Sequence, residues 1–171
     1  LVDVYPTLMD MAGLPHPGGL DGHSLMPELT GAASERPDWV LSESHDSTCD
    51  TGHFMLRRGP WKYIALPGYE PLLFNIEDDP DEVRNAAVDS PEVARRMDAL
   101  LREVVDYEAV DAKVKAYDRA SFRAWREATL AEGTYRDLMA RVFSGWDDLE
   151  PGDIEPWTDE EEARLLEWLE G

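Results

Sequence analysis

The sequence has 171 residues, of which 43% are hydrophobic, and its 37 acidic and 16 basic side chains give a formal net charge of -21. A chain of this length can bury one ordinary core, and six Trp, six Tyr and four Phe supply bulky side chains to fill it. No apolar run approaches the roughly 20 residues of a membrane-spanning helix, and the negative charge repels phosphate backbones. Neither a membrane nor a nucleic acid is therefore an expected partner.

The acidic excess leaves two interpretations open. The only lysines are Lys62, Lys113 and Lys115, and an acidic surface with few lysines is expected of a protein working at high salt, where screening removes the cost of self-repulsion. An acidic protein from an ordinary environment fits equally well. The single cysteine, Cys49, allows no internal disulfide and agrees with a reducing compartment, so we expect a cytoplasmic location.

Residues 1–38 predict a helix followed by a loop. In DVYPTLMDMAG, the side chains of Val4, Leu8 and Met11 fall on one helical face, and Gly13 follows the last turn, which predicts a short helix docked on a core. The next segment, PHPGGLDGHS, is rich in turn residues. LMPELTG then predicts at most a short helix that ends at Gly31.

Residues 39–108 predict an antiparallel sheet and a helix. Four short segments rich in aliphatic and aromatic residues indicate strands at 39–44, 53–58, 61–66 and 71–76. Their close spacing favours antiparallel neighbours, because parallel strands need long crossovers. A helix follows with Ser90 as N-cap and Pro91 in its first position. The expected fold class is α+β, a small four-stranded antiparallel sheet packed against a helix, with a helical C-terminal extension.

Residues 109–171 form the predicted helical tail. One long helix is expected to end at Gly133, TYRDLMARVF can form a second, and the last begins with a capping box from Thr158 to Glu161. A connector rich in Pro and Gly occupies residues 144–157. Apolar residues are spread around the long helix, so this tail resembles a compact core less than the sheet region does. We expect it to lie on another surface, either a missing part of the protein or a second subunit in a homo-oligomer.

The polar stretch ESHDSTCDTGH at 43–53 is the candidate site. It is dense in reactive side chains and joins two predicted strands, where binding loops are common. The functional interpretation places His45, Asp46 and His53 in the wall of a substrate-binding site, and the alternative is a solvated loop. No pair of histidines has the spacing of a zinc motif, so neither a metal site nor a catalytic residue is predicted in this chain.

Several motifs, in order, resemble the C-terminal part of type I sulfatases of the alkaline phosphatase superfamily. They are Pro6-Thr7-Leu8, Ala12-Gly13, Gly22-His23-Ser24-Leu25, the hairpin Arg57–Tyr63 and the turn Leu73–Glu82. The similarity covers about residues 1–108, and Asn75 stands where Asp is usual in the family. The polar loop and the helical tail resemble choline-sulfatase-type members more loosely.

The resemblance implies the C-terminal portion of a sulfuric ester hydrolase, with residues 1–38 ending the catalytic-domain region, 39–108 forming the C-terminal subdomain and 109–171 forming the tail. Sulfatases use formylglycine and a calcium-type divalent metal, both held by an N-terminal catalytic domain. Cys49 is followed by Asp50 and Thr51 and does not match the sulfatase nucleophile signature. The expected partners are therefore that missing domain and a sulfate ester, and no cofactor is expected in this chain.

Two other functions stay open at this point. Phosphonate monoester and phosphodiester hydrolases of the same superfamily share this architecture. The chain could also be a non-catalytic interaction or oligomerisation module.

Overall fold

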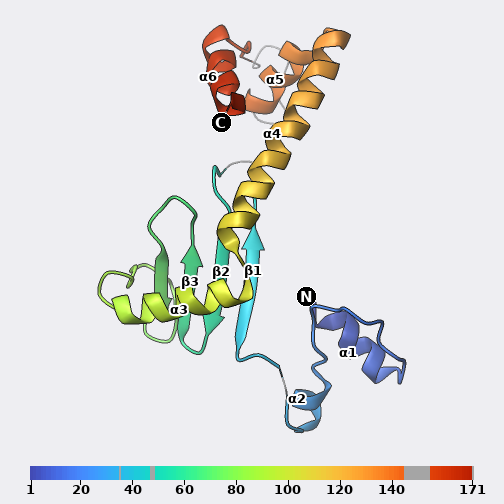
Figure 1. Ribbon diagram of the computed structural model, residues 1–171, viewed down its shortest axis with the longest axis vertical. Coiled ribbons are helices and arrows are strands. Elements are labelled where there is room, and N and C mark those ends of the chain that lie inside the picture. Colours follow the sequence, from blue (N-terminus) through green and yellow to red (C-terminus); the bar gives the residue numbers. More distant parts are fainter. Residues whose placement is uncertain (35, 47–48, 145–154, 171) are drawn as a thin grey trace. The chain divides into compact units, whose positions relative to one another are not determined.

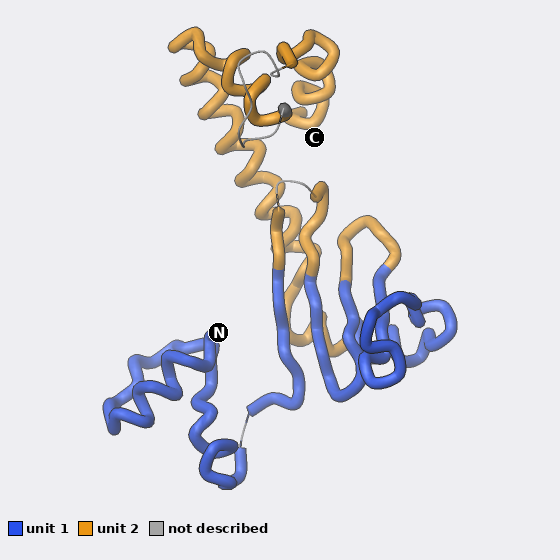
Figure 2. Tube along the Cα trace, turned by 180° about the vertical axis from the view of Figure 1, so that it is seen from behind, with its two compact units in different colours: residues 1–43, 54–64, 71–98 blue, residues 44–53, 65–70, 99–171 orange. Residues whose placement is uncertain are grey.

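The computed structural model describes residues 1–34, 36–46, 49–144 and 155–170. Figure 1 shows the elements in chain order: α1 (Val4–Met11), α2 (Met26–Thr30), β1 (Trp39–Ser44), β2 (His53–Arg58), β3 (Trp61–Ala65), β4 (Leu72–Asn75), α3 (Pro91–Val104), α4 (Tyr107–Glu132), α5 (Tyr135–Ser144) and α6 (Asp159–Glu170). Among the described residues, no helix is both long enough and apolar enough to cross a membrane. Two compact units make up the chain, residues 1–43, 54–64 and 71–98 in one, and residues 44–53, 65–70 and 99–171 in the other (Figure 2).

The sheet confirms the predicted α+β class. Its four strands follow the order β1-β2-β3-β4 and are antiparallel, and Tyr63 on β3 faces Leu73 on β4 in the register. Side chains alternate between the two faces along β2, and Phe54 and Leu56 are completely buried. Gly59 turns the β2–β3 hairpin with a φ of 56°, a left-handed conformation that favours glycine.

Helix α3 begins as predicted and packs its apolar stripe inward. The Ser90 carbonyl accepts hydrogen bonds from the Val93 and Ala94 amides at 3.0 Å, and Pro91 occupies the first helical position. On the inward face of the helix, Met97 is 5% exposed. Next to it, Asp98 accepts a hydrogen bond from the Tyr63 hydroxyl at 3.0 Å, which ties the helix to β3 (Figure 1).

Helix α1 differs from its prediction. The side chains of Val4, Leu8 and Met11, expected to dock on a core, are exposed, and Pro6 and Thr7 are buried instead. On the opposite side of the helix, the Thr7 hydroxyl accepts a hydrogen bond from the Leu25 amide at 2.9 Å. That contact turns the Thr7 face of α1 toward the loop before α2.

The tail has a compact core of its own, which corrects the expectation of loosely spread apolar residues. The side chains of Tyr135, Met139 and Trp157 are at most 7% exposed. Phe122 and Trp125, from the second half of α4, pack against them. The apolar residues are spread along α4 because α5 and α6 both contact it. Gly133 ends α4 with a φ of 73°, as predicted, and most of the predicted connector, residues 145–154, lies outside the described residues.

A half-buried carboxylate organises this tail cluster. Glu162 on α6 accepts hydrogen bonds from the Tyr135 hydroxyl at 2.7 Å, from the Trp157 indole nitrogen at 2.8 Å and from Arg126 Nε at 3.0 Å. The predicted capping box is formed as well, because the Thr158 amide donates to the Glu161 carboxylate at 2.8 Å and the Glu161 amide donates to the Thr158 hydroxyl at 3.2 Å.

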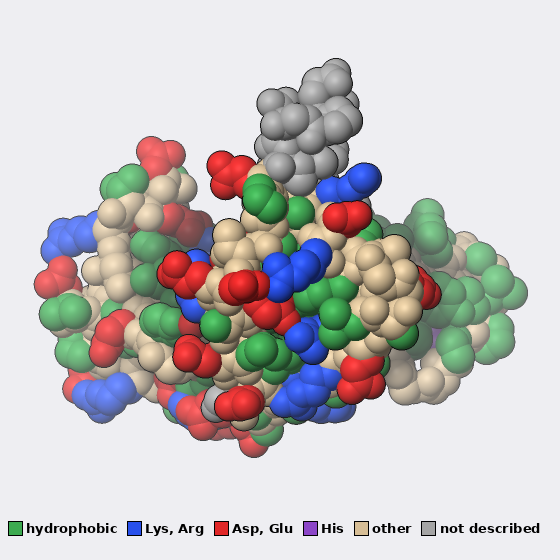
Figure 3. Space-filling model, turned by 90° about the horizontal axis from the view of Figure 1, so that it is seen from above, with side chains coloured by type: hydrophobic (Ala, Val, Ile, Leu, Met, Phe, Trp, Pro, Cys, Tyr) green, Lys and Arg blue, Asp and Glu red, His purple; other side chains and the backbone are tan. Residues whose placement is uncertain are grey.

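Acidic side chains are distributed over the surface. On the face shown in Figure 3, arginine and lysine side chains lie among the carboxylates rather than apart from them. Arg58 and Asp38, for example, form an ion pair at 2.8 Å, and both side chains are more than half exposed. Such pairs cannot neutralise all 37 acidic side chains, because the chain has only 16 basic ones, and the high-salt interpretation stays a prediction.

Candidate functional site

The predicted site residues lie around the loop that joins β1 to β2. His45 and Asp46 directly follow β1 and are exposed, and His53 is the first residue of β2 and is half-buried. The Asp46 carbonyl accepts a hydrogen bond from the Cys49 amide at 3.2 Å. All three predicted residues therefore lie at the same end of the β1–β2 pair.

The second half of this loop is fixed by two other segments of the same compact unit, α4 and the β3–β4 turn (Figure 2). The Gly52 amide donates to Asp111 Oδ1 on α4 at 2.7 Å. The Thr51 hydroxyl donates to the Pro67 carbonyl, in the β3–β4 turn, at 2.8 Å and lies 3.5 Å from Asp111 Oδ1. The Tyr69 hydroxyl of the same turn donates to Asp50. These contacts hold residues 50–52 between α4 and the β3–β4 turn.

Asp111 is the charged centre of this arrangement. It is 5% exposed, and its Oδ2 pairs with Lys115 Nζ, one turn further along α4, at 2.8 Å. Burial alone would raise the pKa of Asp111, but the hydrogen bonds from Lys115 and Gly52, and the charges of Lys115 and His45, outweigh it and lower the pKa. The carboxylate is therefore ionised at neutral pH, with His45 close enough to act on its charge.

Sequence reasoning missed Asp111 and Lys115. One signal was available in the sequence. Asp111 comes four residues after Tyr107 and so falls on the buried face of an amphipathic helix, where an unpaired charge is rare. Lys115 follows at the four-residue spacing of a helical ion pair. The partner on the loop could not be found in this way, because Gly52 is 59 residues away in sequence.

The cofactors that the resemblance implies do not fit the described residues. Among residues 1–34, 36–46, 49–144 and 155–170, no three His, Cys, Asp or Glu side chains are grouped so that they could hold a metal ion. Cys49 is exposed in a loop whose neighbours do not match a formylglycine signature. The metal and the formylglycine are therefore not assigned to residues of this part of the chain.

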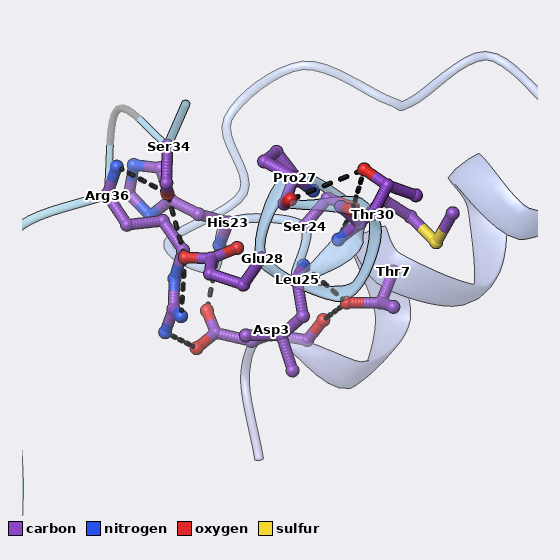
Figure 4. A network of polar contacts seen from close by, with 11 residues as sticks. Asp3, Thr7, His23, Ser24, Leu25, Pro27, Glu28, Thr30, Ser34 and Arg36 are labelled. Atoms are coloured by element: carbon purple, nitrogen blue, oxygen red, sulfur yellow. Dashed lines mark hydrogen bonds and ion pairs between the residues drawn. The ribbon is translucent and has the colours of Figure 1, made fainter. Parts of the chain in front are cut away.

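The family-like motifs near the N-terminus have a structural role, which Figure 4 shows. Asp3 accepts hydrogen bonds from the His23 amide at 2.8 Å and from the Arg36 guanidinium at 2.6 Å. Thr7 links α1 to the following loop, because its hydroxyl accepts a hydrogen bond from the Leu25 amide at 2.9 Å while it donates to the Asp3 carbonyl at 2.6 Å. The Pro-Thr-Leu and Gly-x-Ser-Leu motifs thus contact each other directly.

Gly22 is required by the same contact. A Cβ atom at this position would lie 2.1 Å from the Val2 carbonyl oxygen and 2.9 Å from the Asp3 amide nitrogen. Both are backbone atoms and cannot move aside as a flexible side chain could. A residue with a side chain would therefore separate the loop from the start of α1.

The hairpin and turn motifs also pair with each other. Lys62, in the hairpin motif, contacts Glu82, in the turn motif, at 2.6 Å. Glu82 has a φ of 53°, an uncommon left-handed conformation for a residue with a side chain. Asn75, which replaces the usual Asp, donates a hydrogen bond to Asp78 at 2.6 Å, and an ionised Asp could not donate there.

Comparison with known proteins defines the class. No family model matches the chain. The curated relatives given below are sulfatases, solved sulfatase structures are among those that the chain resembles, and the match falls on the C-terminal part of their chains. The chain therefore belongs with the sulfatases, as a C-terminal portion, which confirms the resemblance found in the sequence.

The relatives are arylsulfatases K. The protein from Danio rerio is 42% identical over 135 residues, which are 75% of this chain and 26% of the relative. The Homo sapiens protein is 37% identical over 138 residues, with 75% and 26% covered, and the Xenopus laevis protein is 35% identical over 157 residues, with 85% and 29% covered. The chain spans about a quarter of the length of the curated relatives it matches.

Solved sulfatase structures also match the chain. The 2-O GAG sulfatase BT1596 matches with a TM-score of 0.57 and 29% identity, over 66% of this chain and 26% of that chain. BT4656, solved with its substrate D-glucosamine-2-N,6-O-disulfate, matches with a TM-score of 0.55 over 64% of this chain and 24% of that chain. At 20% identity, the second match shows the fold alone.

Proposed function

We propose that the protein to which this chain belongs is a sulfuric ester hydrolase acting on a sulfate ester. The observation that carries the proposal is the 42% identity to arylsulfatase K of Danio rerio over 135 residues. In this proposal the chain completes the fold and one wall of the substrate site and is not catalytic alone. An N-terminal catalytic domain would hold the formylglycine, which supplies the nucleophile, and a calcium-type divalent metal, which would stabilise the charge that develops on the sulfate oxygens.

The β1–β2 loop forms that wall in our proposal. His45 or His53 contacts the leaving-group side of the ester, and Asp46 lies beside them. Two observations support this assignment. The loop carries exposed polar side chains at one end of a strand pair, and its second half is held against α4 and the β3–β4 turn. A loop fixed in this way can present a side chain to a substrate at little cost in conformational entropy.

Further proposals concern the organisation of the whole protein. Residues 1–38 end the catalytic-domain region, 39–108 form a C-terminal subdomain and 109–171 form a tail that can join copies in a homo-oligomer. The exposed Trp168 and Phe143 on the tail support the last of these. The single cysteine supports a cytoplasmic location.

Steady-state kinetics of the complete protein test the role of the loop. We expect His45→Ala or His53→Ala to lower kcat/KM for a sulfate ester at least tenfold, a loss of about 1.4 kcal/mol in transition-state binding. His16→Ala, a histidine on the loop after α1 that pairs with Asp10, is the matched control and should leave kcat/KM unchanged. Unchanged kinetics for both loop variants would remove the loop from the substrate site.

The relatives do not favour the other functions. The curated relatives reported above are named as arylsulfatases K, which favours sulfate ester hydrolysis over phosphonate or phosphodiester hydrolysis and over a free-standing interaction module. The chain of residues 1–171 alone should release no sulfate, and turnover by it would contradict the proposed division of labour.

A further inference from the structure

Helix α4 does not need a charged residue at position 111 in order to form. It lies past the N-cap, because Asp106 already accepts the Ala109 amide at 3.1 Å, so its carboxylate does not cap the helix. Four residues earlier on the same face, Tyr107 is 5% exposed, as Asp111 is. Taking a carboxylate out of water at such a position is unfavourable unless partners compensate for the lost hydration.

The groups that compensate the Asp111 carboxylate lie on the loop and on the helix, and each carboxylate oxygen has a different partner. Oδ1 accepts the Gly52 amide at 2.7 Å, and Oδ2 pairs with Lys115 at 2.8 Å. Thr51, beside Gly52, is 8% exposed. Its hydroxyl lies 3.5 Å from Asp111 Oδ1 and donates to the Pro67 carbonyl at 2.8 Å. One side chain of α4 therefore fixes the two residues that come directly before His53.

We propose that Asp111 is a positioning residue, which holds the β1–β2 loop on α4 and thereby sets how the loop meets the leaving-group part of the substrate. The anchoring step depends only on this chain. The effect on specificity rests on the proposed sulfatase function. Lys115 balances the buried charge, so that the pair can be replaced by an uncharged pair of similar size without loss of the contact to Gly52.

Hydrogen exchange of the Gly52 amide tests the anchoring step. In the chain of residues 1–171, we expect Asp111→Ala to speed this exchange at least tenfold, because the amide loses its acceptor. The double variant Asp111→Asn with Lys115→Met keeps an acceptor oxygen and removes both charges, so exchange should stay within about twofold of the parent chain. Asp118→Ala, an exposed acid on the same helix, is the matched control. Unchanged exchange in Asp111→Ala would overturn the anchoring.

A ratio of specificity constants tests the effect on the substrate. The complete protein is assayed with 4-nitrophenyl sulfate and with a sulfated disaccharide, and the ratio of the two kcat/KM values does not depend on how much enzyme is correctly folded. We expect Asp111→Ala to change this ratio at least fivefold. The Asn and Met double variant should restore the ratio, and Asp118→Ala should leave it unchanged.

The outcomes separate the two proposals. If the complete wild-type protein hydrolyses neither sulfate ester, the proposed function fails and the effect on specificity fails with it, whereas Gly52 exchange still decides the anchoring. If the wild-type protein is active and Asp111→Ala leaves the ratio unchanged, the effect on specificity is wrong and the sulfatase function stands. If the double variant behaves like Asp111→Ala, the charge itself, and not the acceptor for Gly52, is what matters, which also contradicts the proposal.

Discussion

Glu162 provides the sharpest test of how the tail folds. Replacing it by Ala removes the acceptor for two nearly buried donors, the Tyr135 hydroxyl and the Trp157 indole nitrogen, and for the Arg126 guanidinium. Each buried donor left without a partner costs about 1–3 kcal/mol. The Arg126 side chain is 23% exposed, so water can take over part of its interaction.

The expected loss for Glu162→Ala is about 4 kcal/mol, the middle of the range that results from about 1–3 kcal/mol for each of the two buried donors. A loss of this size is a large part of the stability of any single domain. The matched control is Glu160→Ala on the same helix, whose side chain is 86% exposed and lies 3.9 Å from Arg164. That variant should change stability by less than about 0.5 kcal/mol.

Native-state hydrogen exchange measures this cluster separately from the sheet. The Met139 amide lies in the middle of α5, and its side chain is 2% exposed in the tail core. Glu162→Ala should speed exchange of that amide about 10³-fold, which corresponds to about 4 kcal/mol of opening free energy. An increase of less than about tenfold would refute the reasoning that Glu162 holds α4, α5 and α6 together.

The same contact predicts a pH dependence at Tyr135. Burial, and then the hydrogen bond to Glu162, raise the pKa of Tyr135 to about 12. A raised pKa means that this contribution to stability is complete below the ordinary value of 10.0 and is lost as the pH rises through about 12. The absorbance of ionised tyrosine, compared between the wild-type chain and Tyr135→Phe, isolates this group. A midpoint near the ordinary value would contradict the contact.

Three further predictions concern the N-terminal motifs, the hairpin and the charge. Gly22→Ala should speed amide exchange in residues 22–25 and cost about 2–3 kcal/mol, whereas Gly18→Ala, where a Cβ meets no atom within 4 Å, should have little effect. Lys62→Met should cost about 1 kcal/mol in denaturant unfolding, and Glu82→Gly less, because glycine relieves the left-handed backbone at that position. The high-salt interpretation predicts that the midpoint of thermal unfolding rises between about 0.1 M and about 2 M KCl, and a flat response would favour an ordinary acidic protein.

Local patterns in the sequence predicted most of the elements. The four strands, the start of α3, the end of α4 at Gly133 and the capping box at Thr158 are present because each depends on residues close together in the chain. Predicted strand ends differ by at most one residue. In these cases a turn, a cap or an alternating pattern carries the information by itself.

Contacts between distant segments could not be predicted in the same way. Periodicity places Val4 and Leu8 on one face of α1 but does not reveal what covers that face, and both side chains are exposed among the described residues. The tail core was missed because its residues come from α4, α5 and α6 together. At the candidate site, the role of the loop and of His45 stays a prediction from the sequence, and Asp111, which contacts the loop, could not be predicted because it is 59 residues from Gly52.

The release of inorganic sulfate by the complete protein tests the central claim most directly. The protein is produced from its whole coding sequence and incubated with 4-nitrophenyl sulfate, and sulfate is measured by ion chromatography beside a matched phosphonate monoester. The account predicts sulfate release well above hydrolysis of the phosphonate, and none from residues 1–171 alone. A complete protein that cleaves the phosphonate and releases no sulfate would contradict it.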